Sequence, residues 1–127
     1  MKWKTNDIMQ DLKKLLVEKG LKAEVKVEDY PGGDYDTPNI CLWPELPDVD
    51  LDAVYACGYN TRKTMEGVDP KNPPHDIEYV EIRNYGSDSD GGLSHDAAKE
   101  TRELYYVLID YFKTRGVSII RHYDQIF

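Results

Sequence analysis

An apolar stripe in the last third of the chain constrains the fold more than any other feature. Its members recur at intervals of three and four residues and are Ala98, Thr101, Leu104, Tyr105, Leu108, Ile109 and Phe112. This spacing predicts a helix over residues 94–115 with one buried face. Ser94 is expected to cap the start of this helix and Gly116 to end it. A helix with one apolar face needs a second layer, which the rest of the chain must supply.

A second helix is predicted near the N-terminus. Its apolar stripe consists of Ile8, Leu12, Leu15 and Leu16. The stripe predicts a helix over residues 6–19, which buries one face and leaves the other in water. Thr5 or Asn6 is expected to cap it, and Gly20 to end it.

Between and after these helices lie short segments with the alternation or apolar runs that are typical of strands. The predicted strands lie near residues 23–29, 39–43, 53–59, 77–84 and 117–123. At 127 residues, the chain suits one domain, residues 1–127, around one core. We therefore expect an α+β fold, in which a mixed or antiparallel sheet of about four to five strands packs against the two main helices.

The charge of the chain is uneven. The net charge is −8, and residues 28–58 contain eight acidic residues and no Lys or Arg. Binding to nucleic-acid phosphates needs clustered cations, so we expect no specific nucleic-acid binding. The acidic segment is compatible with a partner that has a basic surface, and it is also compatible with a solvated loop.

Two further features bear on the cellular setting. No stretch approaches the roughly 20 apolar residues of a membrane span, and the N-terminus lacks the apolar run of a signal peptide. We therefore expect no membrane contact. Cys41 and Cys57 lie in apolar strands without a CxxC pair, which predicts two reduced, buried core residues.

Patterns that would indicate catalysis or metal binding do not emerge from the sequence. The histidines are His75, His95 and His122, and none belongs to an HExxH or Cys-His motif. Spacing does not support a metal site built from Cys41, Cys57 and a histidine. The run 88–91 suggests a calcium loop, but that register places Gly86 and Ala97 where carboxylates are required. We expect no catalytic residues, no metal and no cofactor.

Several local sequences carry a resemblance to a known family. These are residues 7–16, 53–58, 78–84 and the Ala-to-Leu progression from Ala97 to Leu108. Together with their order, they resemble the tail terminator and neck proteins of tailed bacteriophages, often described as minor capsid proteins. Asn84 and Tyr85 replace the short turn usual in the family, and the Gly-Ser-Asp stretch after them is longer. The resemblance therefore leaves open tail terminator, tail completion and head–tail joining proteins.

The resemblance implies a structural virion protein without catalytic activity. It implies a homo-hexameric ring that caps the tail tube and docks to the head–tail connector proteins, present in the host cytoplasm during assembly and in the virion afterwards. An acidic lumen would repel DNA phosphates and let the genome pass through the ring.

Subunits of a ring meet through two different surfaces, and the sequence offers two of opposite charge. The segment 60–76 is long, contains prolines and carries Arg62, Lys63 and Lys71. The acidic segment contributes the other candidate contact residues, Asp34, Asp36, Asp48 and Asp50. We expect these two sets to face each other across the subunit boundary.

Two other classes of function remain open. A small acidic adaptor or inhibitor that binds a basic protein would be favoured if the chain is monomeric. An enzyme would be favoured if the fold brings a histidine beside a carboxylate in a cleft.

Overall fold

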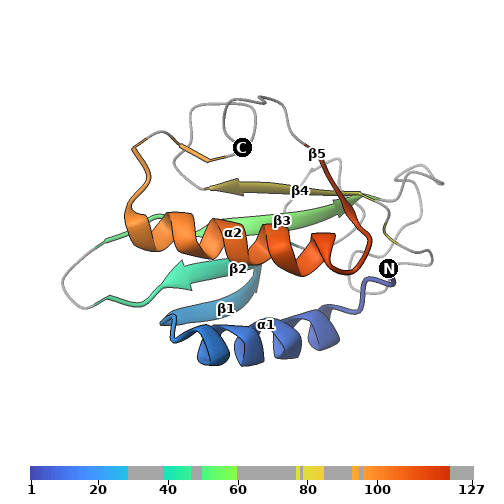
Figure 1. Ribbon diagram of the computed structural model, residues 1–127, viewed down its shortest axis with the longest axis horizontal. Helices are drawn as coiled ribbons and strands as arrows, with labels where there is room; N and C mark the ends of the chain where they lie inside the picture. The colour runs from blue at the N-terminus through green and yellow to red at the C-terminus, as the bar shows by residue number, and fades with distance from the viewer. Residues whose placement is uncertain are drawn as a thin grey trace.

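The described part of the protein folds into a five-stranded sheet with two helices (Figure 1). The computed structural model describes residues 1–28, 39–46, 50–59, 77, 79–84, 93–94 and 96–120. Along the chain the elements are α1 (Thr5–Lys19), β1 (Ala23–Glu28), β2 (Asn39–Pro44), β3 (Val54–Tyr59), β4 (Tyr79–Asn84), α2 (Lys99–Lys113) and β5 (Ser118–Ile120). This arrangement confirms the predicted α+β class.

The sheet is mixed, with the strand order β1-β2-β3-β4-β5. The first four strands are antiparallel neighbours, whereas β5 is parallel to β4. A parallel neighbour needs a crossover connection, and α2 supplies it by running back across the sheet. The sequence was compatible with either a mixed or an antiparallel sheet. The parallel pairing of β4 and β5 shows that the sheet is mixed.

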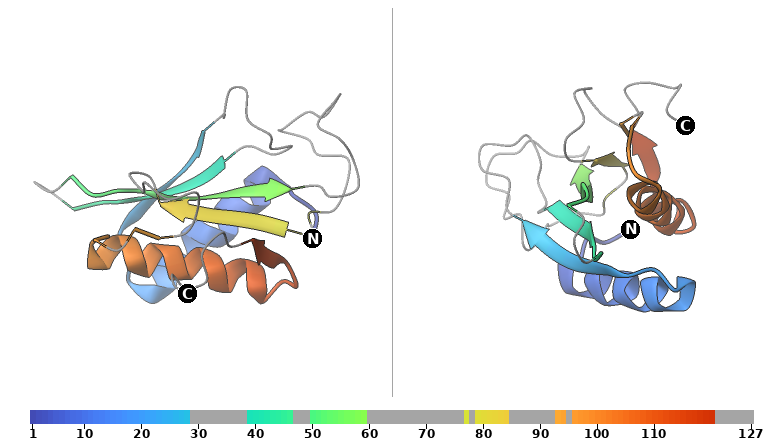
Figure 2. Two further views of the ribbon diagram at one scale, coloured as in Figure 1. Left: turned by 90° about the horizontal axis from the view of Figure 1, so that it is seen from above. Right: turned by 90° about the vertical axis from the view of Figure 1, so that its left-hand side faces the viewer.

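Both helices cover the same face of the sheet (Figure 2). α1 packs beside the edge strand β1, while α2 contacts the other four strands. The strand residues that face the helices alternate along each strand, as a half-buried sheet requires. Register pairing sets Val25 beside Leu42 and Leu42 beside Val54. One continuous core therefore joins the two helices to the sheet.

The N-terminal segment closes one end of this core. Trp3 is buried and stacks on Phe112 of α2, with ring centroids 5.8 Å apart. The amide of Ile77 donates a hydrogen bond to the carbonyl of Met1, and the terminal ammonium of Met1 lies 3.4 Å from the carbonyl oxygen of Ile77. The residues before α1 are thus tied to the entrance of β4.

The predicted helix starts differ from the observed ones. The N-cap of α1 is Lys4, with no side-chain capping hydrogen bond, and Thr5 already lies in the helix. α2 begins at Lys99 after Ala98, so the predicted Ser94 cap is wrong. The amide of Ser94 instead donates a hydrogen bond to the side-chain oxygen of Asn84 at 2.7 Å. This hydrogen bond holds the segment that leads into α2 against the end of β4. The first turn of α2 has no side-chain capping hydrogen bond.

The predicted helix ends agree more closely with the structure. Gly20 has a φ of 68°, and the amides of Gly20 and Leu21 donate to carbonyls in the last turn of α1. This left-handed end favours glycine and confirms the predicted stop. α2 ends at Lys113, before the predicted residue 115, and Gly116 with a φ of 76° belongs to the turn that follows.

The strands lie within one or two residues of their predicted positions wherever the structure describes them. The predicted ends at residues 29 and 121–123 lie outside the described residues.

Candidate functional site

A groove of about 440 Å³ lies between α1 and the last turns of α2. Charged side chains of both signs line most of it: Asp11, Lys14, Glu18, Lys19, Asp110 and Arg115. At its floor, the Tyr111 hydroxyl donates a hydrogen bond of 2.7 Å to the carboxylate of Asp11. The guanidinium of Arg115 stacks on the Tyr111 ring, 3.6 Å from the ring centroid, and lies 3.8 Å from the same carboxylate.

The contacts among Asp11, Tyr111 and Arg115 are suited to holding the two helices together rather than to catalysis. Burial raises the pKa of Tyr111 far above its ordinary value, and the hydrogen bond to Asp11 raises it further, because ionisation would remove the donated proton. A group that holds its proton this tightly does not act as a general base near neutral pH. The Asp11, Tyr111 and Arg115 cluster therefore ties α1 to α2.

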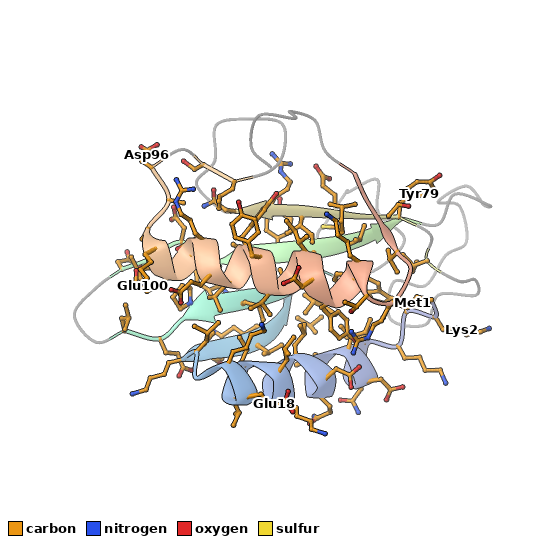
Figure 3. The ribbon with its side chains drawn as sticks, viewed as in Figure 1. Met1, Lys2, Glu18, Tyr79, Asp96 and Glu100 are labelled. Atoms are coloured by element: carbon orange, nitrogen blue, oxygen red, sulfur yellow. The ribbon has the colours of Figure 1, made fainter. Side chains whose placement is uncertain are left out.

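A second groove, of about 330 Å³, lies at the opposite end of the helix pair. We call it the Leu46 groove, and its lining consists of Gly20, Leu21, Lys22, Pro44, Leu46, Glu100, Glu103 and Leu104. Leu46 is 37% exposed at this groove. Figure 3 shows Glu100 at the N-terminal end of α2, where this groove opens. The groove thus combines apolar walls with two carboxylates contributed by α2.

The sheet face away from the helices carries a buried cluster of different chemistry. Cys41, Tyr55 and Cys57 are buried there, with Trp43 packed against them. Glu81 is also buried, and its carboxylate lies 3.9 Å from the Nε of Arg83. The thiol of Cys57 donates a hydrogen bond to the side-chain oxygen of Asn39.

The chemistry of this cluster does not favour a nucleophilic thiol. Burial raises the pKa of Cys57, and the negative charge of Glu81 raises it further, while Arg83 acts weakly in the opposite sense. The thiol therefore remains protonated at neutral pH, and the thiolate is the reactive form. The predicted burial of Cys41 and Cys57 is confirmed, and neither of these two described residues forms a disulfide.

Asn84 organises a third polar cluster that the sequence did not reveal. It is buried, and its amide nitrogen lies 3.4 Å from a carboxylate oxygen of Asp52. The hydroxyl of Thr101 donates to the backbone carbonyl of Asp52 at 2.9 Å. Together with the Ser94 bond, these contacts join the end of β4, the approach to β3 and the first turn of α2. An Asn at the end of a predicted strand gives no signal of such long-range partners.

Of the predicted contact residues, the structure describes Asp50, which is exposed shortly before β3. The predicted partners Arg62, Lys63 and Lys71, and the acids Asp34, Asp36 and Asp48, lie outside the described residues. The three histidines lie outside them as well. The expected pairing of a cationic and an acidic surface therefore stays a prediction.

The described part of the chain contains neither a metal-binding cluster nor a membrane-spanning helix. Within it, no three His, Cys, Asp or Glu side chains gather closely enough to hold a metal ion. Neither described helix combines the length and the apolar character that crossing a membrane requires.

Comparisons with protein-family models, with curated proteins and with solved structures found no match to the chain.

Proposed function

We propose that the protein is a structural subunit of the neck of a tailed bacteriophage or a phage-derived particle. In this role it forms a ring at the head-proximal end of the tail, terminates the tail tube and joins it to the head. The observation that carries the proposal is the element order. An amphipathic helix opens the chain, a long proline-bearing connection separates β3 from β4, and a helix and a short strand close it, as in the family that the local sequences resemble.

The surface chemistry of the described residues supports a role in protein contacts. Both grooves are open and bordered by charged side chains, unlike the mostly apolar cavities that enclose small ligands. The Leu46 groove has apolar walls bordered by Glu100 and Glu103, and a polar rim around an apolar centre is typical of surfaces that meet other proteins. The buried thiol and tyrosine groups retain their protons, which fits a structural role better than a catalytic one.

Neighbouring subunits would meet through surfaces of opposite charge. The cations Arg62, Lys63 and Lys71 of the β3–β4 connection would face the acidic segment of the next subunit. Asp50 is exposed and available for such a contact. The tail tube protein and the connector proteins would bind the two faces of the ring.

The native mass of the purified protein tests the proposal. Native mass spectrometry over a range of protein concentrations is expected to show a closed oligomer, with six copies as the resemblance implies. Negative-stain electron microscopy is expected to show rings with a central hole. A monomer at every concentration would contradict the proposal and would favour the adaptor or inhibitor that binds a basic protein.

A further inference from the structure

We draw no further inference here: the strongest candidate, the Leu46 groove between the end of α1, β2 and the start of α2, carries nothing, because Lys22 and Lys99 offset its two carboxylates and nothing in the described part of the structure shows what covers its apolar walls.

Discussion

The hydrogen bond from Tyr111 to Asp11 joins residues 100 positions apart. The sequence shows where each residue lies on its own helix: Asp11 on the polar side of α1, and Tyr111 beside the apolar stripe of α2. Their pairing depends on how the two helices settle on the sheet, and neither helix encodes that position by itself. Contacts of this kind, like those of Asn84, join residues far apart in the chain, and the sequence alone could not predict them.

Tyr111→Phe should destabilise the protein at neutral pH and should do so less at high pH. Loss of the hydrogen bond is expected to cost about 1 kcal/mol of unfolding free energy. The pKa of Tyr111 is raised in the folded state above the ordinary value of 10, so its contribution is fully present below pH 10 and is lost as pH rises further. Urea unfolding at pH 8 and at higher pH measures the difference between native protein and variant.

The matched control for this prediction is Tyr106→Phe. Tyr106 is exposed on α2, so removal of its hydroxyl should leave the unfolding free energy at pH 8 unchanged. A difference between native protein and Tyr111→Phe that widens above pH 10 would contradict the assignment.

The two cysteines should remain reduced and inert in the native protein. Cys41 pairs in register with Tyr55, which places Cys57 at the diagonal position of the neighbouring strand. Diagonal neighbours have Cα atoms about 7–8 Å apart, beyond the usual span of a disulfide. A thiol reagent is expected to label both residues only after denaturation. Rapid labelling of Cys57 in the folded protein would show that the outer sheet face opens.

At the scale of elements, the apolar stripe of α2 predicted most of its buried face. Leu104, Leu108 and Phe112 are all buried, as periodicity required. Val107 and Tyr111 are buried too, although they lie beside the stripe. α2 packs on the sheet with one side and faces α1 with another, so two sides are covered. Periodicity detects the face toward the sheet, whereas the second depends on the placement of α1.

Leu104→Ala should test the packing of α2 most directly. The substitution removes most of a buried side chain from the core-facing side of α2, and the expected loss is about 2–5 kcal/mol of unfolding free energy. Glu100→Ala changes a half-buried side chain one turn earlier and should cost well under about 1 kcal/mol. Chemical denaturation of both variants provides the comparison. Equal losses would mean that the two positions are buried alike.

At the scale of the whole molecule, the sequence predicted the fold class but could not choose between sheet types. The parallel placement of β5 follows from the path of α2 across the sheet, a feature of the assembled fold rather than of either segment. The grooves show the same limit. The Leu46 groove gathers residues from the end of α1, from β2 and from the start of α2, and no local pattern marks such a set.

The connection between β3 and β4 gives the broadest test of the proposed assembly. Tyr59 and Tyr79 are paired in register, so the ends of these antiparallel strands are already adjacent. A hairpin can join such ends with about two to five residues. The connection is thus far longer than the sheet requires, and added loop length has a small entropic cost. Its cations and prolines are therefore expected to serve a contact outside the subunit.

Replacement of residues 62–72 by a short Gly-Ser linker should leave the subunit folded and weaken the ring. The change removes Arg62, Lys63 and Lys71, which we expect to face the acidic segment of the next subunit. Circular dichroism and thermal unfolding measure folding, and native mass spectrometry measures assembly. A variant with all three cations changed to Ser at full loop length separates charge from length. Rings formed as readily by the shortened protein would show that the connection is passive, and failure to fold would place it in the core.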